Sequence, residues 1–499
     1  MMYDSRKSDR PIVPTKPSNK AEPSAAEGVE GRGLAKGNTD EQNASRTQSR
    51  IQDARSALDR VRQRARQDRK AKFTALFHHL TIERLRDAYL SLQKRAAPGV
   101  DGVTWEQYGE NLEANLLDLH ARLHRGAYRA RPSRRVYIPK ADGRQRPLGI
   151  ASLEDKLVQR AVVEVLNAIY EVDFLGFSYG FRPRRSQHDA LDALAVGILQ
   201  TKVNWVLDAD LRDFFGTINH GWLVQFVEHR IADRRILRLI QKWLSAGVME
   251  EGRWAESEQG SPQGATVSPL LANIYLHYVF DLWIQQWRKR HAQGDVIVVR
   301  YADDVLVGFQ YKPDAMKCLD ALRDRLRRFA LELHPDKTRL IAFGRFANAR
   351  REERQIEGAA ETFSFLGFTH ICAKTKAGKF VLARHTEKKR MRAKLREVKA
   401  DMQRRQHQPI PEQGRWLGQV VRGYFAYHAV PTNIHALSSF RTQLIRTWRR
   451  ALRRRSQRDR TDWARMKDLE QRWLPPARVQ HPWPDERFDV RTRGKSPVR

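Results

Sequence analysis

The segment Val296–Phe309, with the sequence VIVVRYADDVLVGF, constrains the fold of this chain more than any other. Two apolar runs, rich in β-branched residues, flank the adjacent acids Asp303 and Asp304. Runs of this kind form strands, and a β-hairpin with both acids at its tip satisfies the pattern. Because neighbouring carboxylates repel each other unless a cation shares them, the tip of this hairpin is a candidate cation site.

A second apolar run, residues 203–211 with the sequence VNWVLDADL, also ends in acids. Asp208 and Asp210 share one face of this strand, since side chains alternate along a strand. If the strand lies beside the hairpin, three carboxylates converge. Oxygen ligands suit Mg²⁺, and two such ions ~3.5–4 Å apart can stabilise the attacking and leaving oxygens of phosphoryl transfer. The alternative is that these acids occupy separate turns and surfaces.

Residues 260–269, with the sequence GSPQGATVSP, form a Gly- and Pro-rich loop ahead of the helix-like segment 270–283. Small residues let a base pair approach the backbone closely, and Gln263 offers an amide near it. The alternative interpretation is an ordinary loop that leads into a helix.

The net charge of +34 limits the classes of function further. A charge of this size needs a polyanion, with nucleic acid as the first candidate and an anionic membrane surface as the second. The sequence contains no run of ~18 apolar residues that could span a bilayer, and its first residues lack the apolar segment of a secretory signal. The two cysteines, Cys318 and Cys372, are too few for a disulfide framework or a Cys-rich zinc finger. We therefore expect each of them to be a small buried apolar residue.

The composition divides the chain into a leader, a mixed region and a basic helical region. Residues 1–50 are typical of a disordered leader. Residues 51–69 are typical of a very basic helix, which either is solvated or contacts nucleic acid. Helical and β-like runs then alternate up to residue 368, as in α+β or mixed α/β folds. The helical, strongly basic segments 387–405 and 438–455 predict a second domain.

Several short motifs occur in the order of a known family. They are PGVDGVT (98–104), RPLGI (146–150), SYGFRP (178–183), DLRDFF (210–215), PQG and SPLLAN (262–264 and 268–273), YADD (301–304), LHPDKT (333–338) and FLGF (365–368). On these motifs the chain resembles bacterial group II intron-encoded proteins, which are reverse transcriptases with maturase activity. The resemblance extends to the type that lacks an endonuclease domain, because no Cys pairs are present.

The resemblance implies an α+β fold. This fold is a right-hand polymerase, with fingers and a palm that contains an antiparallel sheet, followed by a helical thumb or maturase domain. The expected divisions are a disordered leader (1–50), a basic helical N-terminal extension (51–120), fingers and palm (121–368), thumb or domain X (369–470) and a basic C-terminal tail (471–499).

The resemblance also implies a set of site residues. The catalytic and metal-binding acids, expected to hold two Mg²⁺ ions, are Asp210, Asp303 and Asp304, and Asp208 is the local competitor of Asp210. The residues expected to bind the nucleotide are Lys140, Arg146, Asp213, Phe215 and Gln263. The residues expected to bind RNA recur at helical spacing in the thumb and are Arg446, Arg449, Arg450, Arg453 and Arg454.

The sequence departs from the family pattern at two positions. Gly216 replaces the usual acid after the motif aromatic, and Ala265 replaces the usual second glycine of the loop. The three metal acids are present, so polymerase chemistry is expected to survive. Gly216 removes an acid near the active strand and loosens the backbone, which predicts reduced activity.

By resemblance, the expected function is RNA-directed DNA synthesis that serves a group II intron, together with binding of the intron RNA to assist splicing and mobility. The expected partners are group II intron RNA, an RNA template with a DNA primer, target DNA and dNTPs, with no membrane and a cytoplasmic ribonucleoprotein as the location. One alternative is a catalytically weak RNA-binding splicing cofactor that uses the polymerase fold as a scaffold. Another is a reverse transcriptase of a defence system or other element, against which the maturase-like thumb argues.

Overall fold

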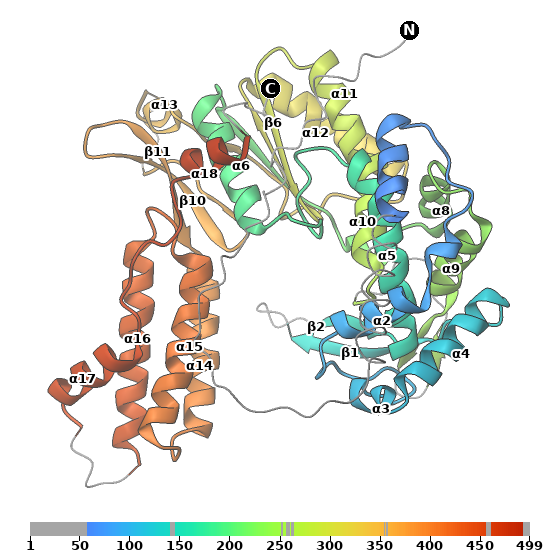
Figure 1. Ribbon diagram of the computed structural model, residues 1–499. Coiled ribbons are helices and arrows are strands. Elements are labelled where there is room, and N and C mark those ends of the chain that lie inside the picture. Colours follow the sequence, from blue (N-terminus) through green and yellow to red (C-terminus); the bar gives the residue numbers. More distant parts are fainter. Residues whose placement is uncertain are drawn as a thin grey trace, which may run out of the picture.

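The computed structural model shows a two-domain protein whose helical C-terminal domain stands apart from a larger mixed domain (Figure 1). The described residues are 57–139, 145–250, 253–255, 260, 264–353, 355, 358–455 and 461–492. The predicted leader, residues 1–50, and the candidate nucleotide-binding residues Lys140 and Gln263 lie outside this part of the chain.

The centre of the larger domain is a four-stranded antiparallel sheet in the order β6-β7-β3-β8. Its strands are β3 (Trp205–Asp210), β6 (Val296–Tyr301), β7 (Asp304–Phe309) and β8 (Arg339–Ala342). β6 and β7 form the predicted hairpin, in which Tyr301 pairs with Asp304. β3 lies directly beside β7, so the predicted neighbourhood of the two acidic strands is confirmed.

Helices pack around this sheet because its strands are apolar on both faces. α6 contacts β6, whereas α12 contacts β3 and β7. Cys318 of α12 is buried and free, as expected, and so is Cys372 elsewhere in the domain. The elements that surround the sheet are α6 (Gln187–Gln200), α7 (Phe214–Thr217), α10 (Ser268–Leu276), the π-helix η2 (His277–Asp281), α11 (Leu282–Arg290), α12 (Lys312–Arg327) and α13 (Ala347–Glu353).

A second lobe of the larger domain carries a four-stranded sheet in the order β2-β1-β4-β5. Its long helix α5 begins where the Ser152 side chain accepts a hydrogen bond from the backbone N–H of Asp155, and most of its residues are buried. The elements of this lobe are a helix over 57–67, η1 (Phe77–His79), α2 (Ile82–Ser91), α3 (Trp105–Gly109), α4 (Leu112–His124), β1 (Ser133–Pro139), β2 (Gln145–Ile150), α5 (Leu153–Asp173), α8 (His220–Glu228), α9 (Arg234–Ser245), β4 (Val248–Glu250) and β5 (Arg253–Ala255).

A three-stranded sheet joins the two domains. Its strands are β9 (Phe363–Phe365), β10 (Phe368–Lys374) and β11 (Phe380–Thr386), in the order β11-β10-β9. Its apolar residues, including Phe363 and Leu382, belong to the same hydrophobic core as the central sheet. The core therefore extends beyond residue 368, where the sequence predicts the end of the first domain.

The C-terminal domain packs four helices around a separate hydrophobic core. The Trp448 side chain is fully buried there and donates a hydrogen bond to Gln413, while Tyr424 stacks on Phe440. These aromatic residues are therefore core residues rather than exposed platforms for bases. The helices are α14 (Lys388–Arg404), α15 (Ile410–His428), α16 (Ile434–Arg453) and α17 (Trp463–Trp473).

After α17 the chain returns to the larger domain, where the sequence predicts a tail. The short helix α18 (Pro484–Thr492) lies against α6, and Phe488 is buried in the larger core (Figure 1). Asp192 of α6 accepts hydrogen bonds from Arg384 of β11, at 3.1 Å, and from Arg487 of α18. The Asp192 and Arg384 side chains are only 3% and 2% exposed, so this ion pair is buried at the junction of three elements.

None of the helices in the described part of the chain is both long enough and apolar enough to cross a membrane.

Candidate active site

Strand register brings the three candidate metal acids together. Asp210, the last residue of β3, is paired with Asp304, the first residue of β7. Directly opposed residues of antiparallel strands have Cα atoms about 4.5–5.5 Å apart. Asp303 lies in the two-residue turn between β6 and β7, next to Ala302, whose φ of 57° is in the left-handed region. The acids thus gather at one end of the central sheet.

Desolvation and neighbouring charge change the proton affinity of Asp303, Asp304 and Asp208. Although part of Asp304 remains exposed, the surrounding protein displaces water from its carboxyl group and, with the negative charges of Asp303 and Asp210, raises its pKa to about 7. Desolvation also raises the pKa of Asp303, and that of Asp208 to about 6. The end of the sheet is therefore a site that favours bound positive charge.

A lysine supplies one such charge. The Lys337 ammonium group lies 2.8 Å from Asp210 Oδ2, and the backbone N–H of His334 donates to the Asp210 carbonyl at 2.7 Å. Both residues belong to the LHPDKT segment that precedes β8. Sequence reasoning used this segment as a motif but assigned Lys337 no role, although it is the basic residue of that motif.

The donor set fits a hard divalent cation in chemical type, since carboxylate oxygens are the ligands that Mg²⁺ prefers. In the described residues, however, no group of three or more His, Cys, Asp or Glu side chains is arranged to hold a metal ion. The Lys337 ammonium group contacts one of the Asp210 carboxylate oxygens, where a bound cation would compete with it.

We expect the substitution Lys337→Ala to strengthen Mn²⁺ binding by about two- to fivefold, because the ion no longer competes with an ammonium group on Asp210. The magnitude is that of a partly exposed ion pair. Electron paramagnetic resonance titration of free Mn²⁺ measures the affinity. The control is Arg404→Ala, which breaks a surface pair with Asp401 at the C-terminal end of α14 and should leave the affinity unchanged. Weaker binding by the Lys337 variant would contradict this interpretation.

The raised pKa of Asp304 also predicts a pH-dependent stability of the metal-free protein. The folded state binds this proton more tightly than the unfolded state, whose carboxyl has its ordinary pKa of 3.8, so stability falls as pH rises from about 4 to about 7. We therefore expect Asp304→Asn to raise the thermal midpoint more at pH 8 than at pH 5. Calorimetry in the presence of a chelator checks this, and an equal effect at both pH values would be inconsistent with it.

The candidate nucleotide-binding residues that the structure describes, Arg146, Asp213 and Phe215, lie around this end of the sheet. Arg146, exposed on β2, is close enough to Asp303 for its positive charge to lower the pKa of that carboxyl against the larger effect of desolvation. Asp213 precedes α7 with a φ of 43°, and Phe215 is half-buried against Phe214. Arg146 is thus brought to the acids, and Phe215 follows the strand that carries Asp210.

Gly260 and Gly264 place the loop that sequence reasoning singled out. A Cβ atom on Gly264 would lie 2.7 Å from the carbonyl oxygen of Gly149 in β2, and one on Gly260 would lie 2.9 Å from that of Phe215. Both glycines also have positive φ angles, of 114° and 88°. Within this loop, Gly264 therefore packs against β2 and Gly260 against α7.

The departure at Gly216 has a local steric correlate. A Cβ atom on Gly216 would lie only 2.4 Å from Oδ2 of Asp213. An acid at this position would therefore require the Asp213 carboxylate to move. Ala265, the second departure, is buried.

The basic residues predicted to bind RNA divide into two kinds. Arg446, Arg450, Arg453 and Arg454 are exposed on or next to α16. Arg449 is partly buried, donates to the carbonyl of Thr461 at 3.2 Å and lies over the Trp463 ring. The first four are therefore accessible to an anion, whereas Arg449 helps to attach α17 to α16.

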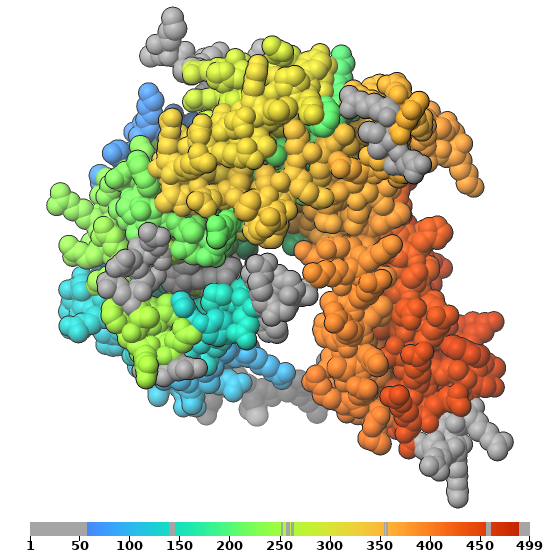
Figure 2. Space-filling view, turned by 180° about the vertical axis from the view of Figure 1, so that it is seen from behind, coloured from blue at the N-terminus to red at the C-terminus, as the bar shows by residue number. Residues whose placement is uncertain are grey.

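A groove separates the C-terminal domain from the lobe that contains β1 and β2 (Figure 2). On its C-terminal wall, between α14 and α15, lies a hollow of about 460 Å³ whose lining includes Arg390, Lys394 and Tyr427. Arg390 lowers the pKa of Asp304 against the larger effects of desolvation and neighbouring acids, so the hollow lies on the side of the acids. The acids thus lie beside an open groove with basic residues on its wall.

Comparison with known proteins agrees with this geometry. Residues 138–370 match the family described as reverse transcriptase (RNA-dependent DNA polymerase). The chain is 35% identical over 288 residues to Protein YkfC of Escherichia coli (strain K12), a match that covers 51% of this chain and 75% of YkfC. It is 34% identical over 235 residues to the group II intron-encoded protein LtrA of Lactococcus lactis subsp. cremoris, a match that covers 47% of this chain and 39% of LtrA.

A more distant relative is nuclear intron maturase 3, mitochondrial, of Arabidopsis thaliana, with 27% identity over 181 residues, covering 32% of this chain and 25% of the relative. The chain belongs to the reverse transcriptase family, among intron-encoded reverse transcriptases and maturases. Enzymes of this family generally use divalent metal ions. The match spans well under half the length of LtrA.

Proposed function

We propose that this protein is an RNA-directed DNA polymerase encoded by a group II intron, which adds dNTPs to a primer 3′-OH on an RNA template. The observation that carries the proposal is the register that sets Asp210 opposite Asp304, next to the turn that contains Asp303. Supporting it, the acids lie beside an open groove, and the raised pKa values of Asp303 and Asp304 reflect a site that favours cations. In this proposal the larger domain supplies fingers and palm, and α14–α17 supply the thumb.

Asp210, Asp303 and Asp304 are the residues that would hold two Mg²⁺ ions. When bound, such ions make the primer hydroxyl more acidic and stabilise the charge on the departing pyrophosphate. Because catalysis of this kind is mostly positioning and charge stabilisation, no nucleophilic side chain is needed. Arg146 binds triphosphate oxygens, for which its guanidinium fork is suited, and Phe215 lies under the sugar and excludes a 2′-OH.

The proposal includes binding of the intron RNA to assist splicing and mobility. The exposed arginines of α16 and the basic face of α14 provide positive charge on the C-terminal domain. Lys and Arg bind RNA phosphates and release counterions when they do so. The proposed partners are therefore the intron RNA, a template with its primer, dNTPs and target DNA.

A primer-extension assay tests the polymerase. The full-length protein, with a DNA primer annealed to an RNA template, dNTPs and Mg²⁺, is expected to extend the primer, and a chelator is expected to stop it. Absence of extension with any divalent cation, in a protein that still binds RNA, would overturn the proposal. That outcome would favour the alternative function, an RNA-binding splicing cofactor that uses the polymerase fold as a scaffold. The specific observation in favour of this alternative is Gly216, which stands where the family usually has an acid.

RNA binding is expected to weaken steeply with salt, by a slope of about −0.7 to −0.9 in log K against log salt for each phosphate contact. Replacing Arg446, Arg450, Arg453 and Arg454 together by Gln should reduce the magnitude of the slope by about 3, if each makes one contact. Filter binding at several salt concentrations measures it. The matched control replaces the same four residues by Lys and should retain the slope. An unchanged slope in the Gln variant would remove these residues from the RNA interface.

A further inference from the structure

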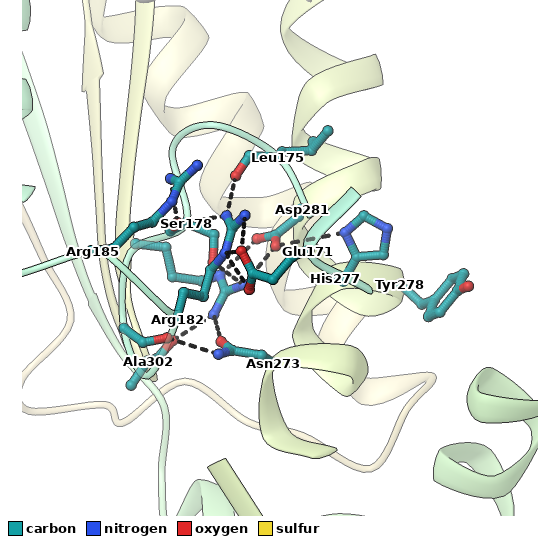
Figure 3. A network of polar contacts seen from close by, with 12 residues as sticks. Glu171, Leu175, Ser178, Arg182, Arg185, Asn273, His277, Tyr278, Asp281 and Ala302 are labelled. Carbon is teal, nitrogen blue, oxygen red and sulfur yellow. Dashed lines mark hydrogen bonds and ion pairs between the residues drawn. The ribbon is translucent and has the colours of Figure 1, made fainter. Parts of the chain in front are cut away.

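Arg300, the residue before the YADD tetrad, is fully buried. It lies next to the turn between β6 and β7 that consists of Ala302 and Asp303, called the Ala302 turn below. A guanidinium group has five N–H donors, and all five are used here. The four partner residues of Arg300 are labelled in Figure 3 and are Ser178, Asn273, Asp281 and Ala302. Nε donates to Oδ1 of Asp281 at 2.7 Å, and Nη2 donates to Oδ2 of the same carboxylate at 2.6 Å. The other three go to the Ser178 hydroxyl at 2.7 Å, the Asn273 amide oxygen at 3.0 Å and the Ala302 carbonyl at 2.9 Å.

The partner Asp281 owes its place to an irregular helix. It ends the π-helix η2, a wider turn between α10 and α11. Such single turns shift the register of the following side chains and are frequent at functional sites. Asp281 is fully buried, and the neighbouring His277 stays neutral because burial lowers its pKa to about 4. The charge that balances Arg300 is therefore Asp281.

The same network fixes the backbone of the Ala302 turn. Nη1 of Arg300 binds both the Ala302 carbonyl and Asn273, and Asn273 in turn donates to the Gly180 carbonyl at 2.7 Å. A Cβ atom on Gly180 would lie 2.2 Å from the Ala302 nitrogen, so the two backbones are in direct contact. Ala302 has a positive φ, which non-glycine residues rarely adopt and which the surrounding structure must enforce.

Stability alone is a weak reason for this arrangement. Desolvation of a buried ion pair offsets most of its attraction, and well-packed apolar residues of similar volume are often as stable or more so. What apolar residues cannot do is donate to the Ala302 carbonyl. The specific product of the network is thus the conformation of the residue that precedes Asp303.

We propose that Arg300 is a positioning residue, which holds the Ala302 turn so that Asp303 and Asp304 direct their carboxylates to the metal site. The inference rests on the proposed function of those two acids. Asp281 and Asn273 act through Arg300, by fixing its guanidinium plane.

The test is the double variant Arg300→Met with Asp281→Leu, which removes both charges and keeps apolar volume. We expect it to fold with a thermal midpoint close to that of the wild-type protein. Its kcat for dNTP addition should fall by about 100-fold, as for a small misplacement of catalytic groups, with little change in the dNTP KM. Its Mn²⁺ affinity, measured by electron paramagnetic resonance without any substrate, should fall as well.

A matched control removes another buried pair of the same domain, by Arg230→Met with Asp173→Leu. Besides Asp173, at 2.8 Å, the Arg230 side chain contacts the carbonyls of Asp68 and Ala71 in the N-terminal part of the domain, so kcat and Mn²⁺ affinity should be retained. If the first double variant does not fold, Arg300→Lys serves in its place, because it keeps the charge but not the five donors. Wild-type kcat and Mn²⁺ affinity in a folded variant would overturn the positioning role. Absence of polymerase activity in the wild-type protein would instead overturn the proposed function, and the Mn²⁺ affinities would still decide the role of Arg300.

Discussion

Substitution of Asp303 by Asn is expected to lower dNTP incorporation by at least about 1,000-fold while RNA binding is retained. The change removes a negative charge from the group of acids at the end of the central sheet, where charge stabilisation provides most of the catalysis. The amide keeps the size of the side chain. Desolvation disfavours the charged form of the Asp303 carboxyl and so raises its pKa, and a neutral amide avoids this cost, so we expect the variant to fold as stably as the wild-type protein. Rapid-quench measurement of single-nucleotide addition, with filter binding of RNA, checks both expectations.

The matched control is Asp208→Asn. Asp208 is opposite Leu306 rather than another acid, and Arg339 lies 3.7 Å from it. It also has a raised pKa, of about 6, but is not among the proposed metal ligands. We expect this variant to keep most of its activity. If Asp208→Asn were as inactive as Asp303→Asn, or if the latter retained activity, the assignment of the metal acids would be wrong.

Substitution of Asp192 by Ala is expected to lower the free energy of unfolding by about 3–5 kcal/mol, because it leaves the buried Arg384 without its counter-charge. The same change removes a hydrogen-bond acceptor of Arg487, so α18 should also loosen from α6. Urea denaturation measures the first effect, and hydrogen exchange of the amides in α18 measures the second.

The control for this prediction is Glu397→Ala, which breaks the exposed pair with Lys394 on α14 and should cost at most about 1 kcal/mol. A loss for Asp192→Ala as small as that of the control would mean that the junction of α6, β11 and α18 contributes little to stability.

The sequence was sufficient to predict β3, β6 and β7, the three strands of the central sheet that carry the acids or lead to them. The apolar, β-branched runs at 203–211 and 296–309 are short and specify strands, and the acids at their ends give a reason to place them side by side. The pairing of Asp210 with Asp304 follows once the two strands are neighbours. The buried cysteines were also predicted, because residues of this type without a metal motif are usually apolar core.

Other parts of the site could not be predicted, because local patterns do not specify which distant side chains meet. Arg300 lies between two apolar runs and has no periodic signal, and its partner Asp281 depends on a π-turn that the sequence does not mark. Lys337 reaches Asp210 across 127 positions of chain. Residues 484–492 contain few apolar residues, so the sequence did not predict that the chain returns to α6. Burial of Phe488 in the larger core stabilises this return.

The return of the chain through α18 has a mechanical consequence for the C-terminal domain. α14–α17 are attached to the larger domain twice, once where β11 leads into α14 and again where the segment after α17 leads into α18. Tyr427 also donates a hydrogen bond to the Leu366 carbonyl, and Asn433 donates one to Thr386 of β11, so the same helices are held at further points. These connections therefore restrict how far the opening beside the acids can change its width.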